Sequence, residues 1–222
     1  MAVVASSVAV RAQLEAIAER LGVELAPAAV DRLMILRGLW LSQGRAINLS
    51  GASTDAGLLE HLGDGLAAWA CASIARTFEG DARWLDVGSG GGFPALVIAA
   101  VAPVQLVLVE PRHRRAAFLE FALASIGHKS PVVRGRMGDT TWCRYCLEQG
   151  ISADNPSFAI ASSRAVFSPE IWLELGDKLV MHGGLVIAHL RPEQDSVADR
   201  APALIVDWNR SRIAGFVRPA SV

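Results

Sequence analysis

The sequence predicts an α/β protein with a doubly wound parallel sheet, preceded by a helical region. An apolar segment at 84–87 runs directly into four glycines within 88–92, and an apolar helix-like run begins at Ala95. A second continuous apolar run occupies 104–109, which is typical of a strand that is covered on both faces. Short apolar segments then alternate with helical patterns to the end of the chain. Such alternation is characteristic of parallel sheets.

The first 80 residues are expected to form helices that pack on a domain spanning 81–222. Their apolar side chains recur every three or four residues, which places them on one face of a helix. Gly22 and Pro27 separate the first two helices, because glycine ends helices and proline is tolerated in a first turn. The helices are expected at 8–21, at 28–41 and from Thr54 or Asp55 onward.

The elements of 81–222 follow from short apolar runs and from the residues that separate them. Strands are expected at 83–87, 104–109, 131–134, 158–161, 185–190, 203–208 and 213–217. Helices are expected at 95–101, at 111–127 and from Ser168 to near Gly183. In the helix at 111–127, the residues expected to face the core are Ala117, Phe118, Phe121, Ala124 and Ile126.

The glycine-rich segment at 88–92 is expected to bind a nucleotide-like cofactor. Glycine permits positive φ and has no Cβ to block a ligand, and the following helix start supplies free N–H donors. The dinucleotide spacing G-x-G-x-x-G is not met, because its third glycine would fall at Phe93. Asp86 instead begins the pattern D-x-G-x-G-x-G, where a carboxylate can accept from the amino group of an amino-acid moiety and repels a pyrophosphate. This pattern resembles motif I of the class I methyltransferases, which bind S-adenosylmethionine.

Glu110 ends the apolar run at 104–109, about 20 residues after the glycine turn, where an acid can hydrogen-bond the hydroxyls of a ribose. Dinucleotide enzymes and adenosylmethionine enzymes share this feature, so it indicates a nucleoside without choosing between them. An acid that caps the next helix is the alternative. Residues 135–139 follow the third expected strand, at the same carboxyl edge of the sheet where ligand contacts are common.

Composition limits the class of protein. A chain of 222 residues suits one α/β domain with an additional element. Hydrophobic residues make up 52% of the chain, yet no uninterrupted apolar stretch reaches the roughly 18 residues expected of a membrane span. The apolar N-terminus also lacks the basic start of a signal peptide. We therefore expect a cytoplasmic protein with no membrane association.

The cysteines do not indicate a disulfide framework or a metal site. There are three of them, an odd number. Cys143 and Cys146 have C-x-x-C spacing, but no second Cys/His pair has the spacing that a structural zinc site needs. A redox pair is expected beside a βαβ start, whereas this pair falls in a helix or loop. We expect no metal and interpret the spacing as coincidental.

Basic residues are concentrated between 112 and 144, where seven Lys/Arg accompany two acids, although the net charge of the chain is only −1. Such a patch is suited to facing phosphates. An ordinary solvated helix face accounts for the same charges nearly as well.

Six motifs, taken in order, resemble the small-subunit (16S) ribosomal RNA guanine-N7 methyltransferases, also called glucose-inhibited division protein B. Residues 40–50 resemble W-N-x-x-I-N-L-T, residues 61–64 resemble H-x-x-D-S, and residues 85–94 resemble L-D-V-G-S-G-x-G-F-P-G. The remaining similar stretches are 108–119, Gly135-Arg136 and Ser163-Arg164-Ala165. The resemblance extends from about residue 33 to about residue 190. Six motifs in this order are far more specific than the glycine turn alone.

The resemblance implies a class I methyltransferase fold with N-terminal helices, S-adenosylmethionine as the cofactor, and 16S ribosomal RNA or the small ribosomal subunit as the substrate. Together with the reasoning above, it gives the cofactor-binding residues Asp86, Gly88, Gly90, Phe93, Glu110, Met137, Gly138 and Arg164. Arg164 is also the expected catalytic residue. The expected substrate-binding residues are Asn48, His61, Arg112, Arg115 and Arg136.

The implied chemistry needs no general base and no metal, because guanine N7 already carries an in-plane lone pair. The enzyme's task is to align N7 with the methyl carbon and the sulfur. Arg164 is expected to donate to guanine O6 or to a phosphate, with a salt bridge at a helix start as the alternative. Asn48, His61 and Asp64 have the alternative role of tying the N-terminal helices to the sheet. We expect a monomer.

The sequence also departs from the family pattern. Glu110 replaces the usual aspartate, and the lysine-glycine stretch and basic C-terminus expected after Gly184 are missing. These departures concern the expected contacts with RNA more than the cofactor site. Two alternatives follow: a methyltransferase of another RNA or of a small molecule, and an adenosylmethionine-binding protein without catalysis. Asp86 and Phe93 make an NAD oxidoreductase the least favoured class.

Overall fold

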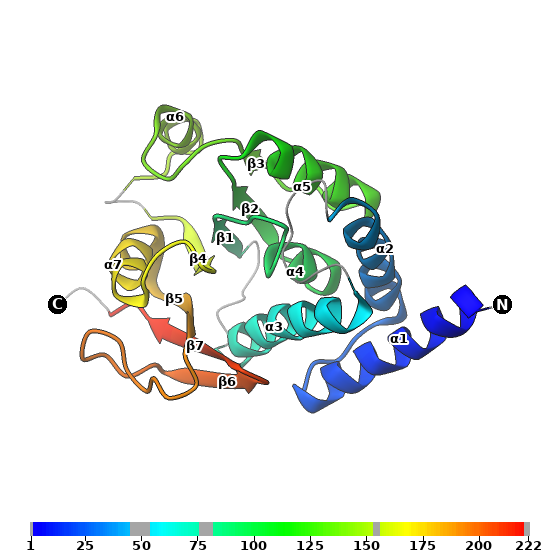
Figure 1. Ribbon diagram of the computed structural model, residues 1–222. Coiled ribbons are helices and arrows are strands. Elements are labelled where there is room, and N and C mark those ends of the chain that lie inside the picture. The colour runs from blue at the N-terminus through cyan, green and yellow to red at the C-terminus, as the bar shows by residue number, and fades with distance from the viewer. Residues whose placement is uncertain (1, 45–53, 76–81, 153–155, 220–222) are drawn as a thin grey trace.

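The structure is a computed structural model that describes residues 2–44, 54–75, 82–152 and 156–219. Seven strands form one sheet in the order β3-β2-β1-β4-β5-β7-β6, with helices on both faces (Figure 1). The helices are α1 (Ala2–Arg20), α2 (Pro27–Gln43), α3 (Asp55–Ile74), α4 (Ala95–Val101), α5 (His113–Ser125), α6 (Thr140–Glu148) and α7 (Pro169–Leu179). The strands are β1 (Arg83–Val87), β2 (Gln105–Val109), β3 (Val132–Val133), β4 (Phe158–Ser163), β5 (Val180–Leu190), β6 (Leu204–Trp208) and β7 (Ser211–Val217).

The sheet is parallel only from β1 to β5, so the prediction of a parallel sheet is wrong for its last two strands. β7 pairs antiparallel with β5, and β6 pairs antiparallel with β7. The physical reason is the connection: only Asn209 and Arg210 join β6 to β7, whereas a parallel pair needs a long crossover. Asn209 has a φ of 49°, a conformation that asparagine tolerates well.

The direction of β6 has a consequence for the site. Because β6 is antiparallel to β7 and β7 is antiparallel to β5, β6 runs in the same direction as the five parallel strands. The turn that follows β6 therefore lies at the carboxyl edge of the sheet, as does the glycine turn that follows β1. Open α/β sheets bind their ligands at this edge.

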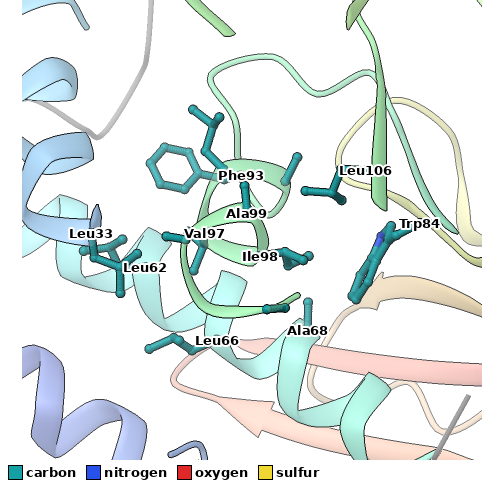
Figure 2. Close-up of a cluster of buried hydrophobic side chains, with 14 of the residues drawn as sticks. Leu33, Leu62, Leu66, Ala68, Trp84, Phe93, Val97, Ile98, Ala99 and Leu106 are labelled. Carbon is teal, nitrogen blue, oxygen red and sulfur yellow. The ribbon is translucent and has the colours of Figure 1, made fainter. Parts of the chain in front are cut away.

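Two hydrophobic clusters cover the two faces of the sheet. On one face, α3 to α5 pack against alternate residues of the strands, including Trp84, Leu106 and Ile187, and α1 and α2 pack on these helices. Figure 2 shows part of this cluster, in which Leu33 of α2 and Leu62 of α3 meet the α4 side chains. On the other face, Trp142 of α6 and residues of α7 pack against the intervening strand residues. The N-terminal helices thus share one core with the sheet. The expected domain boundary at 80/81 involves residues 76–81, which lie outside the described ranges.

The N-terminal helices were predicted correctly, with shifted ends. Thr54 caps α3, and its hydroxyl accepts a hydrogen bond from the backbone N–H of Gly57 at 3.2 Å. Pro27 begins α2, in the first turn where its missing N–H costs little. No helix within the described ranges is both long enough and apolar enough to cross a membrane.

Two details of the helices differ from the prediction. α7 ends at Leu179, not near Gly183, because Val180 already pairs with Phe158 as the start of β5. In α5 the buried face is rotated from the expected one: Phe121 is 52% exposed and Ala117 and Ala124 are also exposed. The residues of α5 that are buried are Ala116, Phe118, Leu119, Ala122 and Leu123. The helix packs against both the sheet and the neighbouring helices, which the sequence pattern alone did not reveal.

Candidate functional site

The glycine turn after β1 is built from positions that only glycine fills easily. Gly88, Gly90 and Gly92 have φ values of 74°, 55° and 94°, in the left-handed region. A Cβ on Gly88 would lie 2.2 Å from Cγ2 of Val166, and a Cβ on Gly92 would lie 2.3 Å from Cδ1 of Leu96. The turn therefore brings its backbone close to the chain after β4 and to the start of α4.

Glu110 holds the glycine turn from the end of β2. It is 3% exposed, and its two oxygens accept from the backbone N–H groups of Gly90 and Arg112, each at 2.8 Å. The backbone N–H groups of Gly88 and Ser89 donate to the carbonyl of Val109 at 2.8 and 3.1 Å. The predicted ribose-binding acid is thus placed beside the turn and also organises its backbone.

Asp86 is a buried carboxylate, and only one of its two oxygens has a hydrogen-bond partner among the described residues. It is 1% exposed, and its Oδ1 accepts from the hydroxyl of Ser162 at 2.6 Å, which in turn accepts from Nε1 of Trp84 at 2.8 Å. Its Oδ2 is buried and has no hydrogen-bond partner among the described residues. Burial raises the pKa of Asp86 to about 6, against the lowering effect of the hydrogen bond from Ser162 and of the neighbouring Ser89 hydroxyl. The negative charge of Glu110 raises this pKa further.

A first cavity of about 310 Å³ opens over the glycine turn. It is lined by His61, Gly88, Ser89, Gly90, Gly91, Phe93, Arg115, Arg164, Ala165 and Val166. The structure thus gathers six of the predicted site residues, from α3, the glycine turn, α5 and the loop after β4. A volume of this size is at the lower end of the range for small-molecule sites.

The N-terminal helices reach this cavity through aromatic side chains. Trp40 of α2 is fully buried, and its Nε1 donates to the carbonyl of Gly91 at 2.8 Å. Its ring stacks on Phe93 with a centroid separation of 4.4 Å. His61 of α3 lies on Phe93 with a centroid separation of 4.9 Å. Two helices outside the sheet therefore support the glycine turn directly.

Arg164 follows β4 and is anchored to α3. Its Nη2 lies 2.6 Å from Oδ2 of Asp64, and both terminal nitrogens lie 3.3 Å from Nδ1 of His61. Burial alone would raise the pKa of Asp64, but the neighbouring His61, whose Nδ1 lies 3.9 Å from Oδ2, and the charge of Arg164 outweigh burial and lower this pKa. His61 and Asp64 therefore do tie α3 to the sheet, as the alternative reading proposed, and they also hold the guanidinium of Arg164 in place.

His189 of β5 completes this polar cluster. Its Nε2 is buried and has no hydrogen-bond partner in the described part of the chain. Burial and then the positive charge of Arg164 lower the pKa of His189 to about 4, although the charge of Asp64 opposes this shift. His189 is therefore neutral at pH 7.

A second cavity of about 560 Å³ adjoins the same cluster. It is lined by Glu60, His61, Asp64, Arg164, Trp208, Asn209, Arg210 and Ser211. His61 and Arg164 line both cavities, so the two spaces meet at this pair of side chains. One cavity belongs to the glycine turn, and the other belongs to α3 and the β6–β7 turn.

Several predicted site residues lie elsewhere. Met137 and Gly138 are in the turn after β3, where Met137 is half-buried against the α6–α7 side of the sheet and Gly138 has a φ of 87°. Arg112 and Arg136 are exposed and line neither cavity, although they lie on the loops after β2 and β3. Asn48 lies outside the described residues.

Sequence reasoning missed the part of the site that comes from the C-terminal half. His189 is a polar residue within the apolar run 185–190, and this interruption of the apolar pattern could have indicated a polar site. Trp208 and Asn209, at the end of an expected strand, were a second signal for a turn at the ligand edge. Ser162, which receives the indole N–H of Trp84 and donates to Asp86, gave no signal in the sequence.

The C-x-x-C pair lies on α6. Cys143 is exposed and Cys146 is half-buried, and both are free thiols. Within the described ranges, no group of three or more His, Cys, Asp or Glu side chains is arranged to hold a metal ion.

Comparisons with known proteins agree on one family. The family model described as GidB, rRNA small subunit methyltransferase G, matches residues 32–209. The ribosomal RNA small subunit methyltransferase G of Chelativorans sp. is 34% identical over 69% of this chain and 71% of its own length. The protein of the same name from Cupriavidus necator is 30% identical over 94% of this chain and 89% of its own length.

Two solved structures show the same fold at low sequence identity. A Salinibacter ruber RNA methyltransferase in complex with S-adenosyl-L-homocysteine has a TM-score of 0.51 and 16% identity, covering 70% of this chain and 92% of that chain. MtNAS in complex with MTA and tNA has a TM-score of 0.53 and 13% identity, covering 86% and 76%. The glycine turn, the sheet and the family match together establish that this chain has the class I methyltransferase fold and belongs to the rRNA small subunit methyltransferase G family.

Proposed function

We propose that this protein transfers a methyl group from S-adenosylmethionine to N7 of a guanine in 16S ribosomal RNA. The observation that carries the proposal is the pair His61 and Arg164, which lines both the cavity of the glycine turn and the adjoining polar cavity. A methyl transfer needs a cofactor and a nucleophile that meet at one boundary, and this pair stands at that boundary.

The residues around the glycine turn fit the cofactor. The turn is a cradle in which a Cβ on Gly88 would collide with Val166, and the buried Oδ2 of Asp86 lacks a partner within the described ranges. We assign Asp86 to the amino group of the cofactor's amino-acid part and Glu110 to its ribose. When bound, S-adenosylmethionine supplies an electrophilic methyl carbon on a sulfonium. Gly88, Gly90 and Phe93 would line the bound cofactor.

The residues after β3 are assigned to the far end of the cofactor. Met137 and Gly138 would lie against the adenine, an assignment supported by the resemblance to the family and by their place after a parallel strand. The whole of 81–222 would then form the cofactor-binding domain, with 1–80 as a helical region packed on it.

Arg164 is the proposed catalytic residue. Its pairing with Asp64 holds the guanidinium in one orientation, so it can donate to guanine O6 or to a phosphate without reorganisation. Guanine N7 needs no base to remove a proton, and the chain's task is to hold N7 in line with the methyl carbon. His61 positions Arg164. It also lines the second cavity, and we assign it to substrate binding.

The basic side chains near 112–136 are assigned to the RNA backbone. Arg112 and Arg136 are exposed and available to phosphates, while Arg115 lines the cofactor cavity. Asn48 is assigned to the substrate on the resemblance alone. The proposed partner is the small ribosomal subunit or its RNA, and we propose that the protein acts as a monomer in the cytoplasm.

Methylation by the purified protein tests the proposal. Small ribosomal subunits from cells that lack this gene would be incubated with labelled S-adenosylmethionine, and label mapped to a guanine N7 of 16S RNA is the expected result. Arg164→Lys keeps a cation beside Asp64 but loses the planar guanidinium with its fixed pair of donors. Turnover should therefore fall roughly 100-fold. Cofactor binding by calorimetry with no label in the RNA would overturn the proposal. It would favour a methyltransferase of a small molecule or an adenosylmethionine-binding protein without catalysis.

A further inference from the structure

We propose that the cavity between α3 and the β6–β7 turn is the pocket for the target base, and that Glu60 selects guanine in it. This inference rests on the proposed function and deepens it, because it names the residues that recognise the substrate. None of the residues at the β6–β7 turn was expected from the sequence motifs.

The pocket is in the correct place for the nucleophile. It meets the cavity of the glycine turn at His61 and Arg164 and has a volume of about 560 Å³, within the range of small-molecule sites. The base that receives the methyl group must lie next to the cofactor and on the other side of a shared boundary. The second cavity meets both conditions.

The walls of the pocket are held in place by packing. Nε1 of Trp208 donates to the backbone carbonyl of Glu60 at 3.3 Å, which joins the β6–β7 turn to α3. A Cβ on Gly63 would come within 2.2 Å of the Trp208 ring, so the indole lies directly on the helix. Ser211 adds a side-chain hydrogen bond to Asp64. The turn and the helix thus form two joined walls of one cleft.

The charges in the pocket leave one carboxylate for a ligand. Asp64 is committed to Arg164 at 2.6 Å. Glu60 lies one helical turn before Asp64, is exposed to the cavity, and forms no ion pair within the described part of the chain. Its carboxylate offers only acceptors, so it requires a ligand with hydrogen-bond donors.

Guanine is the base that satisfies this acceptor. Its Watson–Crick edge carries two adjacent donors, N1–H and the 2-amino group, which a carboxylate can receive together. Adenine and cytosine present a ring-nitrogen acceptor at this edge, and uracil presents one N–H between two carbonyls. Enzymes that act on an extruded base commonly read its Watson–Crick edge in this way. Glu60 would therefore favour guanine over the other three bases.

The same orientation places the reacting atom correctly. N7 lies across the purine from the 2-amino group, and O6 lies between N1 and N7. A guanine held by Glu60 at its Watson–Crick edge therefore presents O6 and N7 away from Glu60, where Arg164 can donate to O6. Arg210, an exposed cation on the β6–β7 turn, is placed to pair with an adjoining phosphate.

The first test compares Glu60→Gln with Glu15→Gln, an exposed glutamate of α1 that lines neither cavity. Both variants would be assayed with labelled S-adenosylmethionine and unmethylated small subunits. We expect Glu60→Gln to lower kcat/KM for the subunit at least tenfold, with an unchanged Kd for S-adenosylmethionine by calorimetry. We expect Glu15→Gln to match the wild type. Wild-type kinetics in Glu60→Gln would overturn the inference.

A substrate change separates recognition from structure. Subunits reconstituted with inosine at the target position lack the 2-amino group, so the wild type should methylate them at least tenfold more slowly than guanosine subunits. Glu60→Gln should show a smaller penalty for inosine, and an equal penalty in both proteins would overturn the role of Glu60. If the wild type transfers no methyl group to RNA at all, the proposed function fails. If it does and only the Glu60 effects are missing, this inference alone fails.

Discussion

Asp86 is a buried residue that affects the stability of the fold and that we propose binds the cofactor. Its pKa of about 6 in the folded protein lies above its ordinary value of 3.8, and burial is the main cause. The folded state therefore binds this proton more tightly than the unfolded chain does, and the ionised carboxylate costs stability at neutral pH. The contribution of Asp86 to the free energy of unfolding should rise as the pH falls from above 6 toward 4. A ligand with an amino group would favour the ionised form instead.

Asp86→Asn tests this dual role. Loss of a charge-assisted hydrogen bond should weaken S-adenosylmethionine binding at pH 8 by roughly tenfold or more. The wild type should itself lose affinity as the pH falls through about 6, because binding must then release a proton from Asp86, whereas the variant should not. Calorimetry at pH 8 and pH 5.5 measures both effects. Asp31→Asn, which changes an exposed ion pair with Arg11, is the control. A wild-type affinity independent of pH would contradict the assignment.

His189 should contribute stability with the opposite dependence on pH. Its pKa of about 4 in the folded protein lies below the ordinary 6.5, so its contribution is complete above pH 6.5 and is lost as the pH falls toward 4. His189→Gln cannot take up this proton, and its free energy of unfolding should fall less than that of the wild type over this range. Urea unfolding at pH 7 and pH 4.5 provides the comparison. His113→Gln, at an exposed histidine, should follow the wild type.

At the scale of elements, the support of the glycine turn by α2 is the least expected feature. Trp40 belongs to a helix far from β1 in sequence, yet its indole N–H satisfies the carbonyl of Gly91 and its ring covers Phe93. A glycine-rich turn has little packing of its own, because it lacks side chains. The helix provides that packing, and the turn is therefore held in a binding conformation by a segment outside the sheet.

Trp40→Phe separates the hydrogen bond from the packing. The ring can still stack on Phe93, but the carbonyl of Gly91 loses its partner, which should cost about 1–3 kcal/mol of stability. For a chain of this size, that corresponds to a melting temperature lowered by about 2–4 °C per kcal/mol. Cofactor affinity should fall as well. Trp69→Phe on α3, a tryptophan that lines neither cavity, should leave that affinity unchanged. Equal affinities in all three proteins would contradict the role of Trp40.

At the scale of the molecule, the helices and the sheet form one unit. The hydrophobic cluster on one face includes Leu33 of α2, Leu62 of α3 and Trp84 of β1, with α4 between them (Figure 2). A helical region that shares its core with the sheet cannot open without exposing the apolar face of that sheet. Because α3 contributes His61 to both cavities, separation of the helices from the sheet would also disturb the walls of both cavities.

Unfolding should accordingly be a single cooperative transition. Far-UV circular dichroism and tryptophan fluorescence should report the same midpoint, because α1–α3 and the sheet lose their common core together. S-adenosylmethionine at 100 times its Kd should stabilise the fold by about 2.7 kcal/mol and raise the melting temperature by roughly 5–10 °C. Two separate transitions, with only the later one shifted by the cofactor, would show that the helical region folds independently.

The sequence by itself determined most of the elements, the glycine turn and the family, but it did not decide whether the region of α6 is a helix or a loop. These features depend on local signals: apolar periodicity marks α2 and β2, glycines mark the turn after β1, and six short motifs identify the relatives. Single helix ends and the buried face of α5 were predicted less well, because packing against neighbours decides them.

Only the tertiary structure decided how the site is assembled. Arg164 meets His61 across 103 residues of chain, and Trp208 meets Glu60 across 148 residues. No local pattern encodes such contacts, since they depend on the order of the strands and on the antiparallel return of β7. That return brings the β6–β7 turn to the ligand edge and creates the second cavity. The cofactor motif can be recognised in the sequence. The proposed substrate pocket forms only when segments far apart in the sequence pack together in the fold.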